Sequence, residues 1–183
     1  MRQNQGICTM KRNLSFNQTV REAIALSLIF LMKTKPFSQI TISEIAQKAG
    51  VSRSSIYRNF NTKEEILTTY VYELYHDFFQ SEDIPLHFPD DSNMKDFLLP
   101  RFRFIRKHSE IFSVLHKNGM LYYTFEQMSP ELVLLLSGQT PSISPYYIAM
   151  FSGSYAAIIA RWIESNFYES EEEMVKIFSS YPR

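Results

Sequence analysis

The chain has 183 residues and a mass of 21.5 kDa, of which 45% are hydrophobic and 21% charged. That is enough to bury a core without disulfides or metals, and its 5 Gly and 8 Pro exclude collagen-like and disordered classes. The net charge is zero, but ten Lys and Arg stand against two Glu in residues 1–63, giving +8 there and −8 in the remainder. A basic N-terminal third is typical of a protein that binds a polyanion.

The single cysteine, Cys8, cannot form a disulfide within the chain, which excludes a secreted disulfide scaffold. The apolar runs are far shorter than the roughly 20 residues that a membrane span needs. No apolar segment follows Met1 as a signal peptide would require. We therefore expect a cytoplasmic protein with no membrane partner.

The first 14 residues are polar and basic without periodicity, so we expect a flexible tail there. A helix should follow, capped by Ser15 or Asn17 and ended by Pro36, because apolar residues then recur at helical spacing. These residues are Val20, Ile24, Leu28 and Leu31.

Three further helices are predicted by their caps. Thr41 and Glu44 form a capping box before a helix over 42–49, and Gly50 stands where a left-handed residue ends a helix. Ser52 should cap a helix over 53–59. A second capping box, from Thr62 to Glu65, should begin a helix over 63–80.

The remainder predicts only helices and loops. Helices are expected near 93–107, 109–117, 120–137, 145–166 and 170–180, with a loop over 81–93. Pro100 and Pro130 should kink or delay their helices, whereas Pro145 suits a first helical position after Ser144. No segment alternates with period two, so the chain is expected to be all-α, with about nine helices.

The helices over 42–49 and 53–59 form a helix-turn-helix. Ala46 and Ala49 are small enough for a close crossing, Gly50 can take the positive φ of the turn, and Val51 and Ile56 fill the interface. The outer face of the second helix would be short and polar, which fits the major groove of DNA.

The stretch from Lys35 to Ile66, KPFSQITISEIAQKAGVSRSSIYRNFNTKEEI, resembles the TetR family of bacterial transcriptional regulators. The later segments Tyr146–Gly153, Arg161–Glu164 and Ser170–Met174 are similar to a C-terminal variety found in regulators related to activators of dihydroxyacetone kinase operons. The resemblance implies a homodimer with a DNA-binding domain over 1–62 and a helical domain for dimerisation and ligand binding over 63–183.

Family roles carried over by position predict contacts with DNA phosphates or base edges. The residues concerned are Thr41, Ser43, Ser52, Arg53, Ser54, Ser55, Tyr57, Arg58, Asn59 and Lys63. The family often has other residues at 54, 55, 59 and 61, so its operator sequences cannot be transferred to this chain.

Two sets of residues are candidates for roles in the C-terminal part. Aromatic and apolar residues that would line a ligand pocket, or only pack in the core, are Tyr70, Leu74, Phe78, Phe97, Phe102, Tyr122, Phe125, Tyr147 and Phe151. Residues at helical spacing that would form a dimer interface, or only pack on their own subunit, are Ser154, Ala157, Ile158, Arg161, Trp162, Met174 and Phe178. The basic residues between Arg101 and His108 are interpreted as a solvated helix face.

Neither a catalytic constellation nor metal-ligand spacing is found, so no enzyme, metal or cofactor is expected. The sequence predicts a DNA-binding transcriptional regulator, a homodimeric repressor released from a pseudo-palindromic operator by a small molecule. The alternative is a DNA-bound adaptor whose C-terminal domain binds a protein partner.

Overall fold

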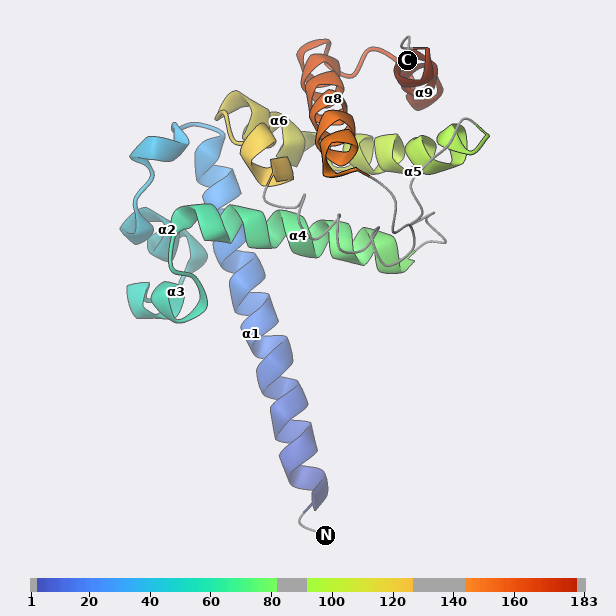
Figure 1. Cartoon of the computed structure of the whole chain (residues 1–183). Helices are drawn as coiled ribbons and strands as arrows, with labels where there is room; N and C mark the ends of the chain where they lie inside the picture. Colours follow the sequence, from blue (N-terminus) through green and yellow to red (C-terminus); the bar gives the residue numbers. More distant parts are fainter. Residues whose placement is uncertain (1–2, 82–91, 127–143, 181–183) are drawn as a thin grey trace. The chain divides into compact units, whose positions relative to one another are not determined.

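The structure is a computed structural model that describes residues 3–81, 92–126 and 144–180 (Figure 1). These residues form helices and turns and include no strand, so the predicted all-α fold is confirmed. The chain divides into two compact units, Met1–Val71 and Tyr72–Arg183. The division falls inside a helix, whereas the domain boundary expected at residues 62 and 63 precedes that helix.

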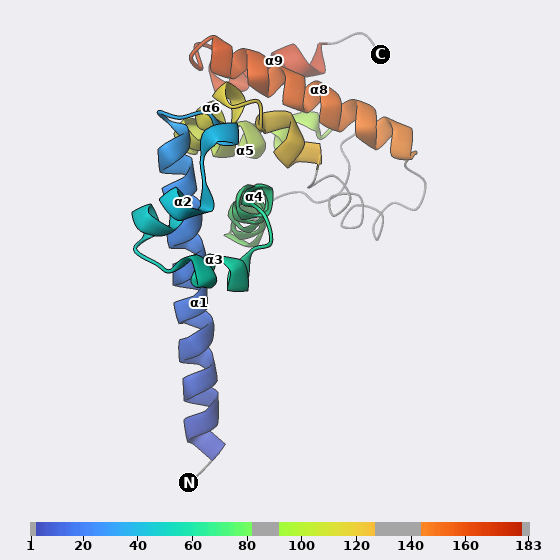
Figure 2. The same ribbon diagram turned by 90° about the vertical axis from the view of Figure 1, so that its left-hand side faces the viewer.

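The N-terminal unit is built from successive short elements on one long helix. They are α1 (Gln3–Met32), the 3₁₀ helix η1 (Phe37–Gln39), α2 (Ile42–Ala49), α3 (Arg53–Asn59) and the first part of α4 (Lys63–Ser81). Helix α1 packs against α2 and α2 against α3, as both views of the ribbon show (Figures 1 and 2). The core comprises Ile24, Leu28, Met32, Ile40, Ile45, Ile56, Ile66 and Leu67, each at most 2% exposed.

Helix α1 begins at Gln3, which corrects the expectation of a flexible tail over residues 1–14 and a helix start near Ser15 or Asn17. The periodic apolar residues farther along are what nucleate a helix. Once nucleated, a helix extends at little cost through residues that lack an apolar face, because each added residue gains one backbone hydrogen bond. No proline interrupts the segment.

The C-terminal unit contains α5 (Met94–Lys107), α6 (Ser109–Lys117), a helical segment over 121–126, α8 (Pro145–Glu164) and α9 (Glu171–Ser179). Helix α5 packs against α9, and α6 packs against α8. Aromatic rings fill the interior between these helices. The buried or half-buried rings are Tyr75, Phe78, Phe97, Phe102, Phe104, Phe112, Phe125, Phe151, Tyr155 and Trp162.

Several predicted helix ends are confirmed. Ser144 caps α8 with Pro145 in its first turn, and Ser170 and Glu173 form a complete capping box on α9. Pro100 lies inside α5 without delaying its start. Pro130 and most of the loop expected over 81–93 lie outside the described residues.

The connection from α8 to α9 is closed by Arg106 of α5. Its guanidinium donates hydrogen bonds to the carbonyl oxygens of Phe167 and Glu169 and pairs with Glu171 at 2.8 Å. It also lies 4.8 Å from the centre of the Trp162 ring. Phe167 has a φ of 56°, which is unusual for a bulky residue, and these contacts hold it there.

Over the described ranges, no helix is long and apolar enough to cross a membrane. Across the same residues, no three His, Cys, Asp or Glu side chains come together as a metal site would require.

Candidate nucleic-acid interface

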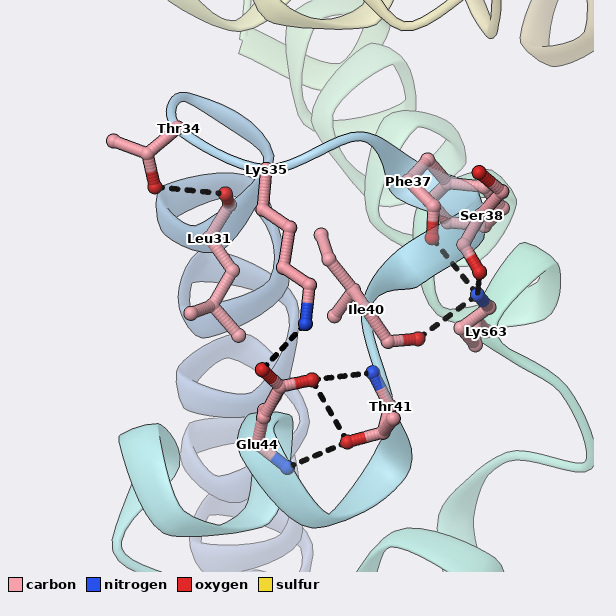
Figure 3. A network of polar contacts seen from close by, with 9 residues as sticks. All are labelled: Leu31, Thr34, Lys35, Phe37, Ser38, Ile40, Thr41, Glu44 and Lys63. Atoms are coloured by element: carbon pink, nitrogen blue, oxygen red, sulfur yellow. Dashed lines mark hydrogen bonds and ion pairs between the residues drawn. The ribbon is translucent and has the colours of Figure 1, made fainter.

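A network of polar contacts fixes the start of α2 (Figure 3). The Thr41 hydroxyl accepts from the backbone N–H of Glu44, and the Glu44 carboxylate accepts from the backbone N–H of Thr41 at 2.8 Å, so the predicted capping box is confirmed. Lys35 pairs with the other oxygen of Glu44 at 2.6 Å. The hydrogen bond from Lys35, followed by those from Thr41, lowers the pKa of Glu44 from 4.5 to about 2.

Lys63 lies in the first turn of α4 and is occupied within the domain. Its ammonium donates to the carbonyl oxygens of Phe37 at 2.8 Å and Ile40 at 2.9 Å, with Ser38 at 3.5 Å (Figure 3). The same nitrogen lies 4.6 Å from the centre of the Phe37 ring. To bind a phosphate as expected, this side chain would have to leave these carbonyls.

The start of α4 differs in one detail from the predicted capping box. The Thr62 hydroxyl accepts from the backbone N–H of Glu65 at 3.0 Å, as expected. The Glu65 carboxylate, however, accepts from the backbone and side-chain nitrogens of Asn61 rather than from Thr62. The reciprocal bond therefore reaches one residue farther back.

The turn between α2 and α3 depends on Gly50. Its φ of 67° is left-handed, and its N–H and that of Val51 return to the carbonyls at the end of α2. Ser52 then caps α3 by accepting from the N–H of Ser55 at 3.1 Å. The turn predicted from the sequence is confirmed by this geometry.

Helix α3 buries Ile56 and presents a polar outer face. Arg53, Ser54 and Arg58 are exposed, and Tyr57 is 54% exposed. Ser55 and Asn59 are half-buried, and the Asn59 amide donates to the carbonyl of Ser55 in its own helix. The predicted readers of DNA on α3 thus lie on the outward side or at its margin.

The hydroxyls of this region divide between capping and exposed positions. Thr41 and Ser52 are held by their caps, whereas Ser43 stands exposed in the first turn of α2. The Ser54 hydroxyl lies 2.8 Å from that of Ser52.

The residues expected to line a pocket do not form one set. Tyr122 and Tyr147 are 61% and 38% exposed, so they lie on the surface, and Tyr70 belongs to the N-terminal unit. Phe78, Phe97 and Phe102 are buried, whereas Leu74, Phe125 and Phe151 are half-buried. Helical spacing did not separate these cases, because a helix flanked by several neighbours carries apolar side chains on more than one face.

The residues expected at a dimer interface also divide. Trp162 and Met174 are 1% and 3% exposed within their own chain, and the Trp162 indole donates to the carbonyl of Glu169 at 2.9 Å. This corrects their assignment to an interface. Half-buried Ile158 and Phe178 are partly covered by their own chain, and Phe178 contacts the Phe151 and Tyr155 rings. Ser154, Ala157 and Arg161 are exposed.

Three interior polar residues were not predicted as a site. Arg101, interpreted as part of a solvated face, is only 7% exposed, and Tyr75 is 6% exposed. The hydroxyl of Tyr155 is buried as well. Both tyrosines follow apolar residues at helical spacing, Val71 and Phe151, and that spacing is the signal that could have placed them inside.

Comparisons with known proteins agree with this geometry. Residues 30–69 match the family model described as bacterial regulatory proteins, tetR family. An uncharacterized HTH-type transcriptional regulator of Bacillus subtilis strain 168, YxbF, is 28% identical over 159 residues, which are 80% of this chain and 40% of that protein. The chain thus spans less than half the length of this curated relative.

Two solved structures share the fold. A tetR-family transcriptional regulator from Streptomyces coelicolor superposes with a TM-score of 0.53 at 15% identity, over 86% of this chain and 78% of the other. A TetR-like transcriptional regulator from Rhodococcus sp. RHA1 gives a TM-score of 0.50 at 12% identity, over 88% and 92%. At such identities the likeness concerns the fold alone.

The first prediction concerns the pH dependence of the Glu44 network. Because the folded pKa of Glu44 is depressed, its contribution to stability is present above its ordinary pKa of 4.5 and is lost as the pH falls toward 2. Glu44→Gln should therefore lower the melting temperature at pH 7, and the difference from the wild type should shrink as the pH is lowered to 3. Glu126→Gln, at an exposed position, is the control. A difference that is constant with pH would contradict the assigned role of the carboxylate.

The second prediction concerns Lys63. Lys63→Met should lower the free energy of unfolding by about 1–2 kcal/mol, because carbonyls bound by a charged donor lose it. Urea denaturation measures the change, and Arg53→Met, on the exposed face of α3, should change stability by less than about 0.5 kcal/mol. Equal stability of the wild type and Lys63→Met would show that this contact contributes nothing.

Proposed function

The chain belongs, through its residues 30–69, to the tetR family of bacterial regulatory proteins, and we propose that it is a DNA-binding transcriptional regulator that acts as a homodimer in the cytoplasm. The observation that carries the proposal is the outer face of α3. It presents Arg53, Tyr57 and Arg58 on a short helix whose inner side is anchored by Ile56.

The charge distribution supports the same function. The formal charge of +8 in residues 1–63 would attract the phosphate backbone. The remaining residues carry −8, which would keep the C-terminal unit off the DNA. In this proposal Arg53, Ser54, Arg58 and Asn59 face base edges or adjacent phosphates. Phosphate contacts fall to Tyr57, to exposed Ser43 and to N–H groups at the start of α2.

A dimer supplies the second recognition helix that a pseudo-palindromic operator needs. In α8, exposed residues recur every three or four positions along one face. They are Tyr146, Met150, Ser154, Ala157 and Arg161, of which Tyr146 is 88% exposed and Met150 is 59% exposed. We assign this face to the dimer interface, since small residues at its middle allow a second helix to approach closely.

Release from the operator by a small molecule completes the proposal. Helix α4 contains residues of both units, because the division between them falls after Val71. A ligand held beside the later residues of α4 would act on the helix whose first turn carries Lys63. Ligand and operator would then weaken each other's binding by the same factor. Repression is the sign of regulation that such release implies.

The third prediction tests the DNA contacts. Arg53→Ala and Tyr57→Ala should each weaken operator binding about tenfold or more without unfolding the protein, because both side chains are exposed. Loss of one phosphate contact should also make the log–log salt slope shallower by about 0.9. The operator is first selected from random duplexes, and affinity is then measured by gel shift.

The matched control is Lys107→Ala, which removes an exposed cation from the C-terminal unit and should leave affinity unchanged. A selection that enriches no two-fold symmetric sequence would overturn the proposal. In a symmetric site, the half-sites should be about 34–36 Å apart or somewhat more.

The fourth prediction tests the interface. A Cβ added at Gly153 would meet nothing within 4 Å in the protomer, so a larger side chain there need not disturb the fold. Gly153→Arg should sediment as a folded monomer and lose operator affinity, whereas Gly153→Ala should remain a dimer. If Gly153→Arg sediments as a dimer with normal operator affinity, the interface lies elsewhere.

A further inference from the structure

Two tyrosine hydroxyls in the interior of the C-terminal unit are unpaired. Tyr75 of α4 is 6% exposed, and its hydroxyl has no hydrogen-bond partner among the described residues. The hydroxyl of Tyr155, on α8, is buried and without a partner in the same part of the chain. A buried hydroxyl without a partner is costly to folding, and native proteins contain few of them. Two that face the same interior point to a group that both would bind.

A buried cation lies beside them. Arg101 of α5 is 7% exposed, donates a hydrogen bond to the carbonyl of Phe97 and lies 3.5 Å from the centre of the Phe97 ring. Its charge acts on both tyrosines and lowers their pKa values, although burial raises them more strongly. Burial lowers the pKa of Arg101 to about 10. At neutral pH this interior therefore holds one positive charge and two O–H donors.

Around these three polar groups the surroundings are aromatic. The centre of the Tyr75 ring lies 4.6 Å from that of Phe104 and 6.3 Å from that of Phe125. The Tyr155 ring lies 5.6 Å from Phe102 and 6.3 Å from Phe178. An occupant would thus meet apolar rings on most sides and polar donors from α4, α5 and α8.

We propose that this interior binds an organic monocarboxylate with an apolar body, whose carboxylate accepts hydrogen bonds from Tyr75 and Tyr155 beside the guanidinium of Arg101. One negative charge matches one buried positive charge. A dianionic phosphate would leave a charge unbalanced among aromatic rings, and a neutral ligand would not use the cation. The inference rests on the proposed function in one respect, because it names the class of ligand that would release the operator.

Binding is tested on the full-length protein by calorimetry with octanoate and benzoate, each paired with its neutral amide. The acids should bind at least tenfold more tightly than the amides. Tyr75→Phe and Tyr155→Phe should each weaken binding of the acid about tenfold, because a hydrogen bond to a charged group is lost while the ring is kept. Tyr122→Phe, at a 61% exposed position, should bind as the wild type does.

Stability without ligand gives an independent readout. If the hydroxyls await a ligand, Tyr75→Phe and Tyr155→Phe should melt at the same temperature as the wild type or higher, since each removes an unpaired buried hydroxyl. If trapped water satisfies them instead, both variants should melt lower and neither acid should bind. That result, or acid binding that neither variant weakens, would overturn the inference.

The DNA measurements separate this inference from the proposed function. Normal operator binding by a protein that binds neither acid would refute the carboxylate site and leave the regulator intact. Acid binding that depends on both tyrosines but leaves operator affinity unchanged would support the site and refute release by ligand. Failure to select any operator would refute the regulator, while calorimetry would still decide the carboxylate site.

Discussion

In each unit, one cation satisfies the carbonyls of a connecting segment, and the placement of the neighbouring helices depends on it. Lys63 donates to Phe37 and Ile40 between α1 and α2, and Arg106 donates to Phe167 and Glu169 between α8 and α9. Such segments have backbone groups that no helix satisfies, and leaving them unpaired on burial is expensive. Both cations also lie near aromatic rings, Phe37 and Trp162, which shield the contacts from water.

The outer face of α3 follows from how the N-terminal unit closes. Glu44, held by Thr41 and Lys35, starts α2, and Gly50 ends it in the left-handed conformation that turns the chain into α3. Burial of Ile56 then determines which side of α3 faces outward. The side chains proposed to read DNA are the ones that this packing leaves exposed, so the stability of the domain and its proposed function rely on the same turn.

The C-terminal unit combines good aromatic packing with polar groups that packing does not explain. Ring contacts join α4, α5, α6, α8 and α9 through residues such as Phe104 and Phe112. A core selected only for stability would bury phenylalanine at 75 and 155, because the tyrosine hydroxyls add desolvation cost without a partner. Retaining them beside Arg101 is understandable if they act on a bound molecule.

Local features were readable from the sequence because they depend on neighbours a few residues away. Capping at Thr41, Ser52, Ser144 and Ser170, the turn at Gly50 and the polar face of α3 are of this kind, and they include most of the candidate DNA interface. Only the tertiary structure decided the roles of Lys63, Arg101 and Trp162, whose partners lie far along the chain or on other helices. Periodicity indicates that a helix has an apolar face, but where several faces are apolar, as in α8, burial depends on which neighbours pack there.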